Sequence, residues 1–281
     1  MSTFQEKLKA LYARQDKIAP LIEGLEDEIP PQSFKDYYTN PKMIIKVDNG
    51  KKLQNCEPIT DLEALFDPLA SEGSAADKHP ISKLLIEGGP GVGKTTSMQY
   101  FTYKWSQGEL WKDKFDYVYR VPLKMLLNRD WNYIPGRQDE DNDDDILKCL
   151  VHYYLVTEER KFCKLGDIPW KKGKTLLLVD GYDEVAHEKK YQKLFEEIFD
   201  HKNIILASRP STINKKMAEK FARKIENTGF DHEGINLYLI RYFKNEKAKG
   251  LAFEEYLEKK PFIKEICHVP AIIAMLVLYV V

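Results

Sequence analysis

The sequence predicts an α/β domain with a parallel sheet flanked by helices, followed by a small all-α helical subdomain. Short apolar segments alternate with helix-length segments between residues 84 and 208, and after residue 226 the strand-like segments stop. A glycine-rich segment, Gly88–Thr95, follows the first apolar segment and opens a helix. Strands that alternate with helices are typical of βαβ units, in which helices cover both faces of the sheet.

Four parts are expected along the chain: an N-terminal helical segment (1–33), a strand and linker region (34–80), the α/β core (81–225) and the helical subdomain (226–281). The last part is expected to be incomplete, because an apolar run ends at the final residue without a helix-capping signal.

Within the first two parts, apolar residues at helical spacing predict one helix or two over residues 1–28, with a break or kink at Pro20. A short strand is predicted over 42–47, a tight turn at Asn49-Gly50 and a flexible connection over 71–80.

The remaining elements are predicted from apolar runs and hydrophobic periodicity. Core strands are expected over 84–87, 115–121, 175–180 and 203–208, and core helices over 94–106, 144–154 and 188–200. An acidic run at 139–145 is expected to be a solvated loop. Subdomain helices are expected over 237–245, 253–258, 263–267 and 271–281.

Composition narrows the possible functions. Hydrophobic residues make up 43% of the chain, charged residues 31%, and the formal net charge is −1. Proteins that neutralise nucleic-acid phosphates usually carry a basic excess, so nucleic acid is not an expected partner. The four cysteines form no CxxC pair, which predicts reduced thiols and a cytoplasmic location. The apolar run 271–281 is shorter than the about 20 residues of a membrane span, so no span is expected.

The segment Gly88-Gly-Pro-Gly-Val-Gly-Lys-Thr95 fits the pattern GxxxxGK[ST]. Glycines allow the backbone N–H groups to point inward around phosphates, and the following helix presents its positive end to the same anion. In this pattern Lys94 reaches the β- and γ-phosphates and the Thr95 hydroxyl binds Mg²⁺. The expected phosphate-binding residues are Gly88, Gly89, Pro90, Gly91, Val92, Gly93, Lys94, Thr95 and Thr96.

Acidic residues follow the apolar strand at 175–180. Asp180 ends this strand, where a carboxylate beside a phosphate loop holds Mg²⁺ directly or through water. Asp183 and Glu184 are candidates to orient or deprotonate the attacking water. Arg209 follows the next strand and is placed to sense the γ-phosphate. The expected catalytic residues are therefore Lys94, Asp183, Glu184 and Arg209.

The order of these segments also indicates the class of nucleotide-binding fold. One apolar strand, at 115–121, lies in sequence between the loop strand and the acidic strand. This layout predicts a P-loop NTPase of the additional-strand type instead of a nucleotide kinase. No Asn-Lys-x-Asp segment for guanine is found, because Asn214-Lys-Lys-Met217 lacks the aspartate. ATP or ADP with Mg²⁺ is the expected ligand.

Together these motifs resemble the NACHT domain of STAND signalling NTPases, as found in NOD-like innate immune receptors. The resemblance covers roughly residues 34–281 and includes the phosphate loop and the acidic signature Asp180-Gly-Tyr-Asp-Glu184. Its other pieces, in chain order, are Leu65-Phe-Asp-Pro68, Trp105-Ser-Gln-Gly-Glu-Leu110, Phe115-Asp-Tyr117, Ala207-Ser-Arg-Pro210, Gly229-Phe230 with Tyr238, and Cys267-His-Val-Pro270.

The resemblance implies further roles. Pro270 would pack on the adenine from the helical subdomain, Tyr38 and Thr39 would touch the base from the other side, and Tyr238 would line the same pocket. Members of this class hold ADP in a silent state, and exchange for ATP drives oligomerisation. The chain would then be a nucleotide-dependent switch with slow ATP hydrolysis, and its partners would be copies of itself or other signalling proteins.

Two alternatives remain open. The chain ends before the winged-helix subdomain of the family, so it could be a non-catalytic receptor fragment with an incomplete site. A housekeeping P-loop ATPase or nucleotide kinase is the other alternative, although neither an Arg-rich lid nor an acceptor pocket is recognisable. Nucleotide affinity distinguishes the fragment from the switch, and the turnover rate distinguishes the housekeeping enzyme.

Overall fold

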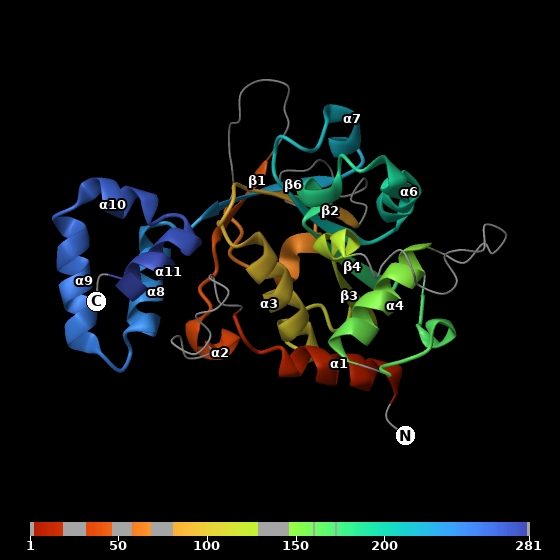
Figure 1. The fold of residues 1–281 in the computed structure, drawn as a ribbon, viewed down its shortest axis with the longest axis horizontal. Helices are drawn as coiled ribbons and strands as arrows, with labels where there is room; N and C mark the ends of the chain where they lie inside the picture. The colour runs from red at the N-terminus through yellow and green to blue at the C-terminus, as the bar shows by residue number, and fades with distance from the viewer. Residues whose placement is uncertain are drawn as a thin grey trace.

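The described part of the chain folds around a six-stranded sheet with the order β1-β6-β2-β5-β4-β3 (Figure 1). The computed structural model describes residues 3–18, 32–46, 58–68, 81–128, 146–159, 161–171 and 173–279. The strands are β1 (Lys42–Lys46), β2 (Lys83–Glu87), β3 (Tyr117–Pro122), β4 (Thr175–Asp180), β5 (Ile204–Ser208) and β6 (Arg223–Gly229). Neighbouring strands are parallel except for the edge strand β1, which is antiparallel to β6. The predicted parallel sheet flanked by helices is confirmed.

The strand β5 separates the loop strand β2 from the acidic strand β4 in the sheet. The strand that lies between them in sequence, β3, instead occupies the sheet edge. The carboxyl ends of β2, β5 and β4 therefore lie side by side, and each delivers one part of the predicted site to this edge. All six residues of β4 are buried, as expected for a strand with neighbours on both sides and helices above and below.

Sequence patterns did not predict β6. Its residues alternate between buried and partly exposed, but Ile225 is its sole large apolar side chain. Two of the other three buried positions are polar, Arg223 and Asn227, which are 2% and 1% exposed, and Gly229 takes the last one. The expectation that strands stop after residue 226 is corrected, because β6 continues to Gly229.

Helices cover the sheet on both faces (Figure 1). The helices of the core are α1 (Phe4–Arg14), α2 (Phe34–Tyr37), α3 (Lys94–Ser106), α4 (Ile146–Glu158), α5 (Tyr182–Val185), α6 (Gln192–Asp200) and α7 (Lys215–Ala218). In Figure 1, α3 and α6 lie on opposite sides of the sheet, α1 packs beside α3, and α4 packs against α6. Only α1 is described within residues 1–28, and it ends at Arg14; Pro20, the turn at 49–50, the connection at 71–80 and the acidic run at 139–145 lie outside the described residues.

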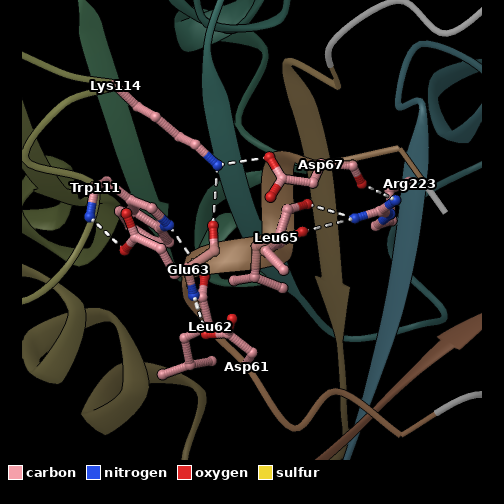
Figure 2. Close-up of polar contacts among 9 residues, drawn as sticks. Asp61, Leu62, Glu63, Leu65, Asp67, Trp111, Lys114 and Arg223 are labelled. Carbon is pink, nitrogen blue, oxygen red and sulfur yellow. Dashed lines mark hydrogen bonds and ion pairs between the residues drawn. The ribbon is translucent and has the colours of Figure 1, made fainter.

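The 3₁₀ helix Glu63–Phe66 is fastened to the core by its main-chain carbonyls (Figure 2). The Arg223 guanidinium donates to the carbonyls of Leu65 at 2.6 Å and Asp67 at 2.7 Å. The Lys114 ammonium donates to the Glu63 carbonyl at 3.1 Å and to the Asp67 carboxylate at 2.7 Å. These donors satisfy the carbonyls that a short helix leaves unpaired at its end. The segment 61–67, which precedes the phosphate loop in sequence, is therefore held firmly against the core.

The helical subdomain consists of α8 (His232–Tyr242), α9 (Lys247–Glu258), α10 (Pro261–Ile266) and α11 (Pro270–Tyr279). These helices gather at one end of the molecule (Figure 1). Their buried residues form a hydrophobic cluster of their own, between Phe230 and Val277, separate from the cluster around the sheet. Among the helices that the structure describes, none is both long and apolar enough to cross a bilayer.

Candidate functional site

The phosphate loop connects β2 to α3 with a backbone that requires glycine. Gly91 and Gly93 have φ angles of +73° and +95°, in the left-handed region that side chains disfavour. A Cβ atom at Gly88 would lie 2.7 Å from the Asn227 carbonyl oxygen on β6. The loop is therefore pressed against β6 and curled over the first turn of α3, as an anion cradle must be.

Lys94, the first residue of α3, turns back over the loop. Its ammonium donates to the Gly88 carbonyl at 2.7 Å and to the Gly89 carbonyl at 2.8 Å. Burial lowers the pKa of Lys94, whereas the negative charges of Asp183 and Asp180 raise it. The lysine thus lies between the loop and the acidic strand end, where a positive charge can hold phosphate.

Asp180 and Thr95 meet across the carboxyl edge of the sheet. Asp180 is 5% exposed, and its carboxylate forms a hydrogen bond with the Thr95 side chain. Burial raises the pKa of the Asp180 carboxyl, and the hydrogen bond with Thr95 opposes this rise. A carboxylate and a hydroxyl are the hard oxygen ligands that Mg²⁺ prefers, so this pair fits the predicted metal site.

The two acids after Asp180 have different environments. Both oxygens of Asp183 are occupied by Arg209, whose Nε lies 2.9 Å from Oδ2 and whose backbone N–H donates to Oδ1 at 3.2 Å. Glu184 lies beside the turn at Gly181, and burial together with the charges of Asp180 and Asp183 raises its pKa. A raised pKa suits a general base, so Glu184 is the better candidate to take a proton from water.

A cavity of about 140 Å³ extends from the phosphate loop between the core and the helical subdomain. All four residues predicted to contact the base line it together with part of the loop. The lining consists of Ile18, Gln32, Tyr37, Tyr38, Thr39, Pro41, Gly91, Gly93, Thr96, Phe230, Tyr238, Tyr242, Pro270, Ala271, Ala274 and Leu278. The lining is mostly apolar and aromatic, as expected of a site for a flat heterocycle.

Two lining residues have contrasting polar groups. The Tyr38 ring stacks on Tyr100 at a centroid distance of 3.8 Å, and its hydroxyl lies 3.3 Å from the Ser97 hydroxyl, so this side chain is largely engaged by α3. The buried Thr39 hydroxyl oxygen has no hydrogen-bond partner. An unpartnered buried hydroxyl is unfavourable, and a polar edge of a ligand in the cavity would relieve this.

The helical subdomain contacts the loop directly. The Ala271 N–H at the start of α11 donates to the Gly91 carbonyl at 3.2 Å, and Pro270 Cγ lies 4.0 Å from where a Cβ of Gly93 would be. Sequence patterns missed the junction behind this contact. Gly229 has φ = +84°, and the Phe230 N–H donates to the His268 carbonyl at 2.7 Å, which joins the end of β6 to the turn before α11.

Comparison with known proteins places these features in a family. The family model for the NACHT domain matches residues 82–246, more than half of the chain. "NACHT, LRR and PYD domains-containing protein 10" of Homo sapiens is 26% identical over 238 residues, which cover 78% of this chain and 32% of that protein. "NACHT, LRR and PYD domains-containing protein 3" of Rattus norvegicus is 23% identical over 234 residues, which cover 75% of this chain and 20% of that protein.

The chain thus spans between a fifth and a third of the length of these relatives. The matched region includes the phosphate loop, the acidic strand end, Arg209 and the start of the helical subdomain. Residues 3–18 and 58–68 lie before the match, yet they pack into the same core. The chain is a P-loop NTPase fold that belongs to the NACHT domain family.

Proposed function

We propose that this chain binds ADP and ATP with Mg²⁺ and uses them as a switch, with slow ATP hydrolysis. The observation that carries the proposal is the shared cavity, whose walls come from the phosphate loop, the segment 37–41 and helices α8 and α11. A ligand in such a cavity stabilises one relative placement of core and helical subdomain. Differential affinity for two placements is the basis of a conformational switch.

The residues present fit a nucleotide. The glycines at 88, 91 and 93 leave a cradle that side chains would fill, and Lys94 supplies a cation beside it. The unpartnered Thr39 hydroxyl offers a polar contact to a base. In the proposal, Lys94 and the loop amides hold the phosphates, and Thr39, Tyr238 and Pro270 surround the adenine.

Thr95 and Asp180 would hold Mg²⁺, which neutralises charge on the phosphates when it is bound. Glu184 would accept a proton from the attacking water. Asp183 would act through Arg209: in the structure one of its oxygens pairs with the guanidinium, and the other accepts from the Arg209 backbone N–H. Arg209 could exchange this carboxylate for a γ-phosphate, since both are anions that a guanidinium binds. Such an exchange would report which nucleotide is present.

The wider role is also proposed. The relatives carry NACHT, LRR and PYD domains in their names, and the family likeness supports nucleotide-dependent oligomerisation in innate immune signalling. Copies of the chain or other signalling proteins would be the partners. A cytoplasmic site of action is supported by the sparse and unpatterned cysteines.

The first test is to identify the nucleotide in the purified chain. The protein is denatured, the released nucleotide is separated by chromatography, and ADP and ATP affinities are measured by calorimetry. We expect ADP to co-purify and Lys94→Ala to weaken binding by at least about tenfold, since a charge-assisted contact contributes about 1.5–3 kcal/mol. The matched control is Lys104→Ala on the same helix, where the side chain pairs with Glu109 at the surface.

Phosphate release then distinguishes a switch from a housekeeping enzyme. Slow turnover that Glu184→Gln reduces further, with ADP affinity unchanged, is the expected result. Rapid multiple turnover would favour a housekeeping ATPase. A wild-type chain that binds neither nucleotide would refute the proposed function and favour the receptor-fragment alternative.

A further inference from the structure

Helix α8 is joined at both ends to one short segment of the core. At its N-terminal end, Asp231 lies 3.6 Å from the Lys42 ammonium at the start of β1. Just beyond its C-terminal end, the Lys244 ammonium lies 3.4 Å from the Asp36 carboxylate of α2. The same ammonium lies 5.0 Å from the centroid of the Tyr37 ring, within the range of a cation–π contact. The segment 36–42 therefore runs along α8 between two ion pairs.

These two elements form facing walls of the candidate base pocket. Tyr238 and Tyr242 of α8 line the cavity from the helical subdomain. Tyr37 and Thr39 line it from the core segment. A bound base would lie between these two walls, and the two ion pairs connect them.

Each wall is fastened on its own side. The core wall is fixed by the stacking of Tyr38 on Tyr100 and by the Phe34 N–H, which donates to the Asp16 carboxylate at 2.8 Å. On the other side, Tyr238 of α8 packs in the hydrophobic cluster of the helical subdomain, with its ring centroid 5.7 Å from that of Phe230. A seam between two well-fixed walls is the place where the pocket can open, and the ion pairs bridge this seam.

We propose that the pairs Lys42–Asp231 and Asp36–Lys244 form a clamp that slows the release of nucleotide from the base pocket. The clamp deepens the proposed function and rests on it, because it requires a nucleotide in the cavity. All four side chains are positioning residues: they act through α8 and the segment 36–42, and none of them lines the cavity.

The expected effect on the release rate follows from how exposed the four charged side chains are. The four charged side chains are between 40% and 52% exposed, so each pair contributes weakly. Exposed ion pairs of this kind correspond to a change of about 1.5- to 5-fold in an equilibrium constant. If the clamp must open before release, loss of both pairs together should accelerate release by about 2- to 25-fold. Salt should accelerate wild-type release as well, because it screens exposed charges.

The experiment measures release of a fluorescent ADP analogue after addition of excess unlabelled ADP. The variants are Lys42→Ala, Lys244→Ala and the double variant. The control is Lys259→Ala, which removes the ion pair between Lys259 and Glu255 at the C-terminal end of α9. We expect faster release in each clamp variant, the largest effect in the double variant, and wild-type release in the control.

A charge reversal separates the ion pair from general damage. Lys244→Glu alone should accelerate release, and Asp36→Lys in addition should restore slow release. The backbone part of the α2 cap is kept in both, since the Ser33 hydroxyl still accepts from the backbone N–H of residue 36, and Asp36→Lys removes the bond that this hydroxyl donates to the Asp36 carboxylate. Release at the wild-type rate in the double alanine variant, or no rescue by the reversed pair, would overturn the clamp. A wild-type chain without measurable ADP binding would instead refute the proposed function itself.

Discussion

Gly229 joins the sheet to the helical subdomain, and replacing it with alanine should disturb this junction. The residue ends β6 with φ = +84°, where an L side chain is strained. An alanine Cβ would lie 2.1 Å from the His268 carbonyl oxygen, and this oxygen accepts the Phe230 N–H at 2.7 Å. Because the two nearest atoms, the carbonyl oxygen and carbon of His268, belong to the backbone, the turn before α11 must move.

The loss of stability can be estimated from the backbone strain and the lost hydrogen bond. A left-handed conformation in a non-glycine residue is unfavourable by about 1–2 kcal/mol. Loss of the Phe230–His268 hydrogen bond adds about 0.5–1.5 kcal/mol. Gly229→Ala should therefore destabilise the chain by about 1.5–3.5 kcal/mol, which corresponds to a melting temperature lower by about 3–14 °C. Pro270 and Ala271 follow the displaced turn and line the cavity, so ADP affinity should also fall.

The assay pairs thermal unfolding with ADP titration and uses Gly108→Ala as a matched control. Gly108 has φ = +72°, but a Cβ there would meet no atom within 4 Å. This control keeps the backbone strain and removes the clash, so it should lower the melting temperature less and leave ADP affinity unchanged. Equal losses of stability in both variants, with equal ADP affinity, would show that the His268 contact does not matter and would refute the reasoning.

Two further predictions concern buried charge. Burial raises the pKa of Asp180. The folded state therefore loses stability as the pH rises and this carboxyl ionises, and it keeps that stability at low pH, where the carboxyl is protonated. Asp180→Asn should therefore raise the melting temperature of the nucleotide-free chain, more at pH 8 than at pH 4.5. A difference in melting temperature between variant and wild type that stays constant with pH would contradict this. Arg223→Met removes two short hydrogen bonds to the carbonyls of Leu65 and Asp67 and should lower stability by about 2–4 kcal/mol in urea unfolding (Figure 2). Lys114→Met, whose ion pair is partly exposed, should lower it by about 1 kcal/mol or less, and equal effects would argue against a special role of Arg223.

The strongest sequence predictions concerned elements whose signal is local. Four buried strands of the sheet were expected within two residues of their observed ends, because a strand covered on both faces must be apolar throughout. The helix 94–106 was predicted with its observed bounds, because the phosphate-loop pattern that precedes it opens a helix. In contrast, β6 is held by buried polar residues whose partners are distant in sequence, and no local pattern shows such partners.

The candidate site divides in the same way. The sequence determined the phosphate loop, Asp180 and the candidate bases, because glycine geometry and a carboxylate at a strand end follow from a few adjacent residues. Only the tertiary structure decided that Arg209 forms an ion pair with Asp183 and that Glu184 remains available as a general base. It also decided that α8 is joined to the segment 36–42. These contacts join residues up to 208 positions apart, such as Asp36 and Lys244. Their distances depend on how separate elements pack, and packing is a property of the whole chain that no local sequence pattern contains.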